Sequence, residues 1–201
     1  MGNFSDRVMI GLYAGYLRLV CATCKMTQQG WFNFRESGEK VAFSFWHGSS
    51  YLMYPQMQHT GTAIITTINR RGDFVKGIGE KFGYVPFRLP DEEKQASGDV
   101  RKLIKETANS HIAIAMDGPL GPYHIPKRFL FTIAYLSKKR IVPLTVSAKR
   151  VIRLTKRWDK FIIPLPFSEI VVTFHEPLTV QKENFDELKE KIVSINGGNT
   201  E

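Results

Sequence analysis

The chain has 201 residues, of which 43% are hydrophobic and 12% aromatic, and it carries a net charge of +9. This composition supplies a packed core and excludes a disordered chain, and the length fits one domain, which we expect to cover residues 1–201. The charge favours phosphate-bearing molecules or anionic membrane surfaces as partners. The basic residues form scattered pairs and triplets without a zinc-finger spacing, an RNA-binding aromatic motif or a basic arm, so nucleic acid is not an expected partner.

The first predicted element is an apolar helix at residues 8–27. Residues 8–24 are apolar apart from Arg18, and as a helix they would reach about 25 Å, short of the ~30 Å hydrocarbon core of a bilayer. A signal peptide fits poorly because Asp6-Arg7 is a weak charged start and no cleavage site is clear. The pattern leaves two alternatives open: a helix seated in one face of a membrane, and a helix packed on the core.

Cys21 and Cys24 form a C-x-x-C pair inside this helix. A zinc site would need a second pair of ligands, and a thioredoxin-like redox site would need the pair between a strand and a helix. Two packed thiols are the simpler interpretation and fit a reducing, cytoplasmic setting. The histidines other than His47 also lack the spacing of metal ligands, so no metal site is expected.

After this helix, predicted strands and helices alternate through a core at residues 30–180. The strands are predicted at 41–46, 63–68, 84–87, 112–116, 141–146 and 170–174, and the helices at 74–82, 96–108, 126–137 and 184–195. This alternation indicates an α/β fold with a mostly parallel central sheet flanked by helices. The strands at 41–46 and 112–116 are apolar throughout, as a sheet covered on both faces requires.

Three polar residues follow or end predicted strands. His47 follows 41–46, Arg88 follows 84–87 and Asp117 follows 112–116. Ligands of open α/β sheets bind beyond the carboxyl ends of the strands. If these strands run parallel, the three side chains meet at one edge of the sheet.

His47 is the first candidate for chemistry at that edge. An imidazole titrates near neutral pH and can act as a general base on a hydroxyl, and the small residues Gly48 and Ser49 leave room for a substrate. The alternative is a histidine that caps the next helix or binds a backbone carbonyl.

Two further strings are dense in special residues. Residues 117–122 read D-G-P-L-G-P, and two glycines with two prolines indicate a rigid loop that can point backbone amides at an anion or position a carboxylate. Residues 158–167 surround the Asp159–Lys160 pair with aromatics and prolines, which fits either the lip of a cleft or a structural loop. Neither G-x-S-x-G nor a P-loop occurs, which argues against a serine hydrolase and a nucleotide kinase.

The chain resembles the bacterial lysophospholipid acyltransferase-like proteins in four strings. In chain order these are W-H-G, D-G-P-x-G-P, V-P and W-D-x-F-x-I-P-x-P-F. That group is related to the glycerophosphate and lipid A acyltransferases, and the resemblance covers about residues 30–180. It implies a glycerophosphate-acyltransferase-like fold and transfer of a fatty acyl chain from an acyl thioester to a hydroxyl of a lysophospholipid or lipid A-like acceptor.

The resemblance also implies roles for single residues. His47 matches the histidine that deprotonates the acceptor hydroxyl, but Leu52 stands where that histidine's acid is usual. Asp117 is therefore the candidate to orient His47 or to shape the site, and it is the second expected catalytic residue. Arg88 matches the arginine that grips the acceptor's anionic group, although Leu89-Pro90 follow it in place of the usual glycine and serine.

The remaining expected substrate-binding residues come from the same matched blocks. Leu120 replaces a usual arginine, Arg71-Gly72 replaces an expected Asp-Gly with Asp73 adjacent, and Pro143 matches a structural V-P block. Besides Arg88, the expected set is Ser49, Arg71, Asp73, Gly118, Pro119 and Gly121.

The implied partners are a lipid acceptor, a membrane surface, and acyl carrier protein or coenzyme A as the thioester co-substrate, with no bound cofactor. The implied location is the cytoplasmic side of a bacterial inner membrane, as a peripheral or monotopic protein. Because Leu52 and Leu120 displace expected polar residues, a non-catalytic lipid-binding protein on the same fold is the alternative.

Overall fold

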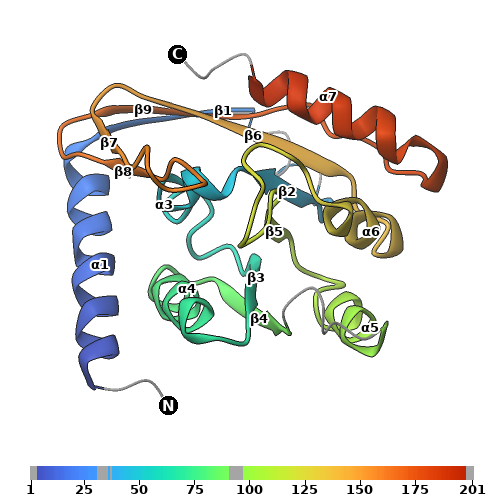
Figure 1. Cartoon of the computed structure of the whole chain (residues 1–201), viewed down its shortest axis with the longest axis horizontal. Helices are drawn as coiled ribbons and strands as arrows, with labels where there is room; N and C mark the ends of the chain where they lie inside the picture. The colour runs from blue at the N-terminus through green and yellow to red at the C-terminus, as the bar shows by residue number, and fades with distance from the viewer. Residues whose placement is uncertain (1–3, 31–35, 37, 91–96, 198–201) are drawn as a thin grey trace.

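The computed structural model describes residues 4–30, 36, 38–90 and 97–197, and its centre is a seven-stranded sheet of order β1-β9-β6-β2-β5-β3-β4 (Figure 1). The strands β6, β2, β5, β3 and β4 are all parallel, β9 is antiparallel to β6, and β1 is parallel to β9. This arrangement confirms the α/β class with a mostly parallel sheet. The bounds are β1 Lys25–Gln29, β2 Ala42–Phe45, β3 Ala63–Thr67, β4 Val85–Leu89, β5 Ile112–Ala115, β6 Ile141–Ala148 and β9 Glu169–Phe174.

Helices cover both faces of the sheet. They are α1 Phe4–Thr23, α3 Ser50–Met53, α4 Arg70–Lys81, α5 Ser97–Glu106, α6 Arg128–Leu136 and α7 Phe185–Gly197. Side chains alternate across each strand, so Phe43 packs in the apolar cluster with Leu17 of α1 and Ile78 of α4. Its neighbour Ala42 packs in the opposite cluster, with α6 and α7. In Figure 1, α1 stands at one side of the molecule and α7 lies across the far corner.

The central strands β2 and β5 are buried because they lie in the middle of the covered sheet. All four residues of β2 and three of the four in β5 are buried, as their continuous apolar sequence predicts. The two strands pair in parallel with Phe45 opposite Ala115, and the Met116 amide donates to the Phe45 carbonyl at 2.9 Å. This register brings His47 and Asp117 to the same edge.

A second, two-stranded sheet stands over that edge. It is an antiparallel hairpin of β7 Val151–Arg153 and β8 Ile162–Pro164, with Val151 opposite Pro164. The hairpin contacts α3, and its loop returns residues 154–161 toward the carboxyl end of β2. Neither strand was predicted, because three-residue strands give no usable periodicity.

Some predicted bounds were wrong. The N-terminal helix, predicted at 8–27, begins at Phe4 and ends at Thr23, and the polar residues Lys25–Gln29 form the edge strand β1 through backbone pairing with β9. The helix predicted at 74–82 begins at Arg70 because the Asn69 side chain caps it, accepting from the Gly72 amide at 2.9 Å.

Two other helices differ less from the prediction. The helix predicted from 126 begins at Arg128, two residues after Pro126. The helix predicted at 96–108 is α5, which ends at Glu106, and residue 96 lies outside the described residues. Within the described part of the chain, none of the helices combines the length and apolarity needed to cross a membrane.

Candidate active site

The imidazole of His47 is paired with a carboxylate that lies far away in the sequence. His47 begins a one-turn 3-10 helix, His47–Ser49, directly beyond β2. Its Nδ1 lies 2.8 Å from Oδ2 of Asp159, which sits in the loop of the β7–β8 hairpin. The Asp159 side chain is fully buried, whereas a quarter of the His47 side chain is exposed. The pair therefore combines a shielded carboxylate with an accessible imidazole.

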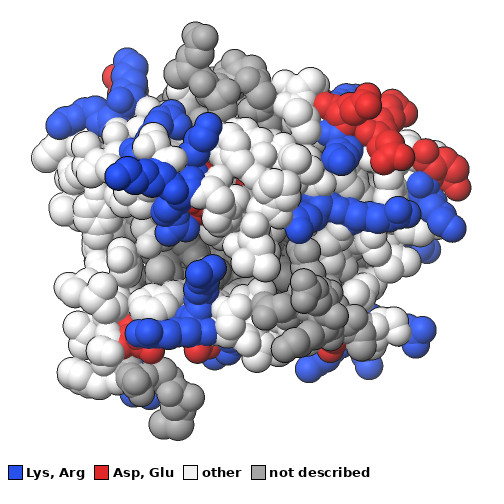
Figure 2. Space-filling view, viewed as in Figure 1, with Lys and Arg blue, Asp and Glu red and all other residues white. Residues whose placement is uncertain are grey.

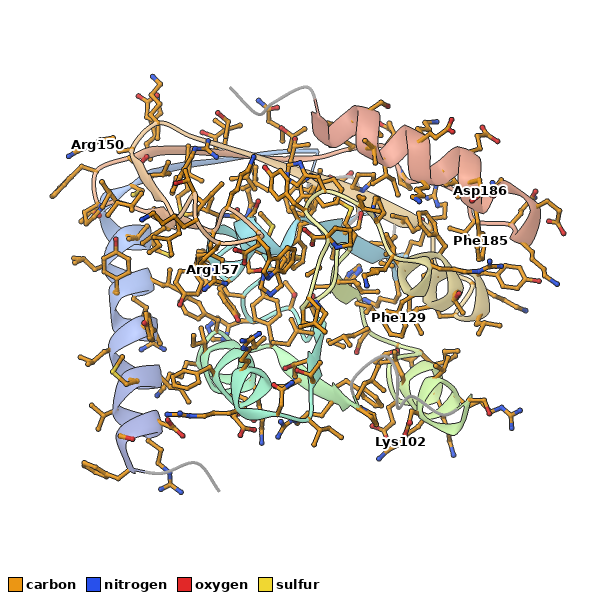
Figure 3. All side chains as sticks on the ribbon, viewed as in Figure 1. Lys102, Phe129, Arg150, Arg157, Phe185 and Asp186 are labelled. Atoms are coloured by element: carbon orange, nitrogen blue, oxygen red, sulfur yellow. The ribbon has the colours of Figure 1, made fainter. Side chains whose placement is uncertain are left out.

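Arg157 fixes the carboxylate from the other side. Its Nε donates to Asp159 Oδ1 at 2.9 Å and its Nη2 donates to Asp159 Oδ2 at 2.8 Å. This two-pronged contact is the geometry in which a guanidinium recognises a carboxylate best. Figure 3 shows Arg157 turned toward the middle of the molecule, while Arg150 of the same hairpin lies at its outer edge. Arg157 is half exposed, so it links the buried charge to solvent.

The electrostatics of the pair favour a neutral imidazole beside an ionised carboxylate. Burial lowers the pKa of His47, and the hydrogen bond that its ring donates to Asp159 opposes this shift without overcoming it. Burial alone would raise the pKa of Asp159, but hydrogen bonds from Arg157 and His47 outweigh it and the pKa lies below its usual value. An ionised carboxylate can only accept hydrogen bonds, so Nδ1 carries the proton and Nε2 keeps a free lone pair.

Asp117 meets the backbone of His47, and its predicted contact with the ring is not observed. Its Oδ1 accepts a hydrogen bond from the His47 amide at 2.8 Å. The side chain is completely buried, and among the described residues its Oδ2 has no hydrogen-bond partner. Burial raises the pKa of Asp117 to about 6, against the lowering effect of the His47 amide. Asp117 therefore holds the turn that carries His47, and Asp159 orients the ring.

Two glycines allow the turn after β2, the 117–122 loop and the Trp158–Asp159 segment to pack closely against one another. A Cβ on Gly48 would lie 2.2 Å from the Asp159 carbonyl oxygen, and a Cβ on Gly121 would lie 2.6 Å from the Trp158 ring. Gly121 also has a φ of +73°, which side chains rarely adopt. The turn after β2 and the D-G-P-L-G-P loop thus both need glycine to approach the Trp158–Asp159 segment.

The other predicted loop residues surround this packing. The Ser49 amide donates to the Trp46 carbonyl at 2.9 Å, and Ser49 lines a small cavity beside the pair. Gly118 is buried with a φ of +69°, and its amide donates to the Ala115 carbonyl at 3.1 Å. Pro119 is partly buried in the same loop. These positions shape the loop. The Gly118 amide already donates to the Ala115 carbonyl within the turn, so a substrate would have to displace that hydrogen bond.

Arg88 and Asp73 were both expected to bind the substrate. In the structure they form an ion pair with each other. Arg88 lies within β4, and its Nη1 is 2.7 Å from Asp73 Oδ1 of α4. Its Nη2 donates to the Thr67 carbonyl at 2.9 Å. The guanidinium is thus largely engaged by the protein. Arg71, at the exposed start of α4, lies close enough to His47 for its charge to lower the pKa of that imidazole.

Sequence reasoning missed Asp159 and Arg157 as functional partners of His47. The resemblance places the acid five residues after the histidine, where Leu52 of α3 is 1% exposed and packs in the core. A carboxylate at that position would be buried among apolar side chains. The available signal was the aspartate inside the W-D-x-F string, but no spacing rule ties a loop residue to a strand end 112 positions away.

Among the residues that the structure describes, no group of three histidine, cysteine, aspartate or glutamate side chains gathers in a way that could hold a metal ion. Cys21 and Cys24 are free thiols on and just beyond α1, and the Cys24 thiol donates to the Leu165 carbonyl at 3.3 Å.

A relative of known sequence offers no function to transfer. No family model matches the chain. A protein of Rickettsia prowazekii (strain Madrid E), named only as uncharacterized protein RP090, is 31% identical over 143 residues, which are 70% of this chain and 64% of that protein. The chain thus spans less than two thirds of this relative's length.

A solved structure shares the architecture. It is the 1-acyl-sn-glycerophosphate (LPA) acyltransferase PlsC from Thermotoga maritima, with a TM-score of 0.53 and 13% sequence identity over 98% of this chain and 82% of that one. Similarity at this level of identity concerns the fold. The chain therefore has an acyltransferase-like α/β fold with the His47–Asp159 pair at the carboxyl edge of its sheet.

Proposed function

We propose that this chain is an O-acyltransferase that moves a fatty acyl chain from an acyl thioester to a hydroxyl of a lysophospholipid or lipid A-like acceptor. The observation that carries the proposal is the pairing of His47 with a fully buried, arginine-held Asp159 at the carboxyl end of β2. This is how proteins prepare a neutral imidazole to act as a general base. The acyltransferase-like fold agrees with it.

In the proposed reaction, Nε2 of His47 takes the proton of the acceptor hydroxyl as the hydroxyl oxygen attacks the thioester carbonyl carbon. The tetrahedral intermediate then collapses with cleavage of the carbon–sulfur bond, and the leaving thiolate takes the proton back from Nε2. Asp159 stays ionised and stabilises the imidazolium formed between these steps. The acyl thioester, of acyl carrier protein or coenzyme A, is a co-substrate, and no bound cofactor is needed for this chemistry.

The oxyanion of the intermediate needs hydrogen-bond donors, and backbone amides of the 117–122 loop are the candidates. The Gly118 amide is committed to the Ala115 carbonyl. Among the described backbone hydrogen bonds, none uses the amide of Leu120 or Gly121, so we propose these two as donors. Leu120 is 73% exposed at the tip of the loop, where the resemblance leads one to expect an arginine. An apolar tip fits a lipid acceptor.

The N-terminal helix supports attachment to a membrane surface. One face of α1 packs on the core and on α4 through Ala14, Leu17 and Val20. The other face leaves Leu12 62% exposed and Leu19 52% exposed. An apolar stripe on a helix of this kind fits monotopic insertion into one leaflet. We place the protein at the cytoplasmic side of a bacterial inner membrane, where lipid acceptors and acyl thioesters are both accessible.

The test is acyl transfer by the purified protein with acyl-carrier-protein or coenzyme A thioesters and a panel of lysolipids. We expect His47→Ala to lower the rate by roughly 10²–10⁴-fold, the contribution of a positioned base. His59→Asn is the matched control, because His59 is exposed and has a φ of 57° that asparagine tolerates.

Thioester consumption at the same rate by wild type and His47→Ala would refute the role of His47. Lipid binding that survives His47→Ala, together with no transfer from any thioester, would instead favour the non-catalytic lipid-binding alternative.

A further inference from the structure

A cavity of about 50 Å³ adjoins the His47–Asp159 pair. Its wall includes Gly48 and Ser49, which directly follow the histidine, and Asp159 itself. On the scale of roughly 10–15 Å³ for each water, it has room for about three waters or for one phosphate-sized group. It lies between the carboxyl end of β2, the middle of β6 and the β7–β8 hairpin.

The charge of this cavity is positive. Arg153 and Lys160 line it, and within the described residues neither has a carboxylate within 4 Å. The one lining carboxylate, Asp159, is already balanced by Arg157. Burial lowers the pKa of the lining His124 to about 4, so this imidazole is neutral at pH 7. Among the described residues, neither of these two cations forms an ion pair at the cavity.

The cavity is also lined by a residue with an unused hydrogen-bond donor. Trp46 is 6% exposed, and among the described residues its indole Nε1 has no partner. The indole ring is held in place because it stacks on His124 at 4.3 Å, which stacks on Tyr123 at 3.7 Å. The ammonium of Lys160 lies over the Tyr123 ring at 4.4 Å. A buried N–H without an acceptor costs free energy, and a bound anion would relieve that cost.

Arg88, the residue that the sequence assigns to the acceptor's anionic group, is engaged elsewhere. Its guanidinium is 2.7 Å from Asp73 and donates to backbone carbonyls of Thr67 and Asn69. An anion at Arg88 would have to displace that carboxylate. Arg71 of α4 also lies near His47, but the cations that line the cavity are Arg153 and Lys160 on the hairpin side.

We propose that the cavity binds a phosphate group of a substrate, with Arg153 and Lys160 supplying the charge and the Trp46 indole and Ser49 hydroxyl supplying neutral donors. The assignment to a substrate rests on the proposed acyl transfer, while the preference for phosphate rests on the cavity alone. The phosphate can belong to the acceptor's head group or to the phosphopantetheine of the thioester donor, and kinetics separate the two.

The first arm of the test is binding, without turnover. Glycerol 3-phosphate and inorganic phosphate are titrated by calorimetry into wild type, Arg153→Gln/Lys160→Gln and Arg150→Gln/Lys156→Gln. The last variant removes two charges from the same hairpin at positions outside the cavity lining. We expect the cavity variant to bind phosphate roughly ten- to a hundred-fold more weakly, the effect of losing charged hydrogen bonds, and the control to stay close to wild type.

The second arm is kinetic and identifies the source of the phosphate. If the acceptor supplies it, the cavity variant raises KM for lysophosphatidic acid and leaves KM for an uncharged monoacylglycerol unchanged. If the donor supplies it, KM for the thioester rises with both acceptors. All four substituted side chains are exposed, so the thermal midpoint of each variant should match wild type.

The cavity site is refuted if the wild type does not bind phosphate. It is also refuted if both double variants lose the same amount of phosphate affinity. Selective weakening supports it even if no thioester is ever consumed, in which case the proposed acyl transfer falls and the phosphate site stands. If acyl transfer depends on His47 but no KM changes in the cavity variant, the phosphate site is contradicted. The proposed acyl transfer is then still supported.

Discussion

The two carboxylates next to His47 have opposite environments. Asp159 is buried but receives hydrogen bonds from Arg157 and His47, which hold its pKa below the usual value. Asp117 is buried and accepts from the His47 amide through Oδ1, and burial raises its pKa to about 6. Neighbouring acids whose pKa values are pushed apart have different roles. Here Asp159 orients the imidazole, and Asp117 fixes the backbone that carries it.

This difference predicts how Asp117 affects stability. An acid whose folded pKa lies above its unfolded value stabilises the fold while protonated, below about pH 4, and loses that contribution as pH rises to about 6. Asp117→Asn keeps an acceptor for the His47 amide and never ionises. We expect the variant to match wild type at low pH and to have a higher free energy of unfolding, by up to about 3 kcal/mol, at pH 7.5.

Denaturant unfolding at pH 4 and pH 7.5 measures this effect. Asp117→Ala is the contrasting variant, because it leaves the His47 amide without an acceptor and should lower the free energy of unfolding by about 1–3 kcal/mol. If Asp117→Asn were as unstable as Asp117→Ala at pH 7.5, the ionised form of Asp117 would be contributing a stabilising interaction, and the assigned role would be wrong.

At the scale of single elements, the β7–β8 hairpin completes the site. Residues 149–160 carry Lys149, Arg150, Arg153, Lys156, Arg157 and Lys160, all exposed, with Asp159 as their one acid. The hairpin thereby delivers both the orienting carboxylate and the cations that face the cavity. Because Gly48 leaves no Cβ between the turn and the Asp159 backbone, the loop can descend onto the end of β2.

The helix α1 is the element that we assign to the membrane. Burying an exposed leucine in hydrocarbon is worth about 1.5–3 kcal/mol, so Leu12→Glu/Leu19→Glu should weaken binding to anionic phospholipid vesicles at least roughly tenfold. Vesicle co-sedimentation measures it. Both side chains are more than half exposed, so the thermal midpoint should not change. Val193→Glu, on α7, is the control for a charge added at an exposed apolar position.

Unchanged vesicle binding in the α1 variant would contradict attachment through this helix. Equal loss in the α1 variant and in Val193→Glu would show a general charge effect, and would also contradict it.

At the scale of the whole molecule, charge is unevenly distributed. Figure 2 shows several lysine and arginine side chains on the side that holds the hairpin, and acidic side chains next to further basic ones at the corner that holds α7. The helix α7 begins with Asp186 and Glu187 in its first turn. We propose that the positive charge next to the catalytic candidate favours the approach of anionic surfaces and substrates to that side.

Sequence reasoning predicted the parts of this arrangement that follow from periodicity and strand order. Buried strands at 41–46 and 112–116 required a covered parallel sheet, and a parallel sheet required His47 and Asp117 to share an edge. The path of residues 154–161 obeys no such rule, because it is set by tertiary packing of Gly48 and Gly121 against the hairpin loop. The sequence therefore offers Asp117 as the candidate to orient His47 or to shape the site, and it cannot identify Asp159 as the partner of the ring. Likewise, β1 forms through backbone pairing and carries no apolar signal.

The measurement that tests the central claim most directly compares initial rates of acyl transfer by Asp159→Asn and Asp117→Asn. Both substitutions preserve shape, and both sites lie beside His47. We expect Asp159→Asn to lose roughly 10²–10⁴-fold in rate because the imidazole loses the acceptor that fixes its tautomer, and Asp117→Asn to stay within about threefold of wild type. An inactive Asp117→Asn beside an active Asp159→Asn would contradict the account, because the ring would then depend on Asp117.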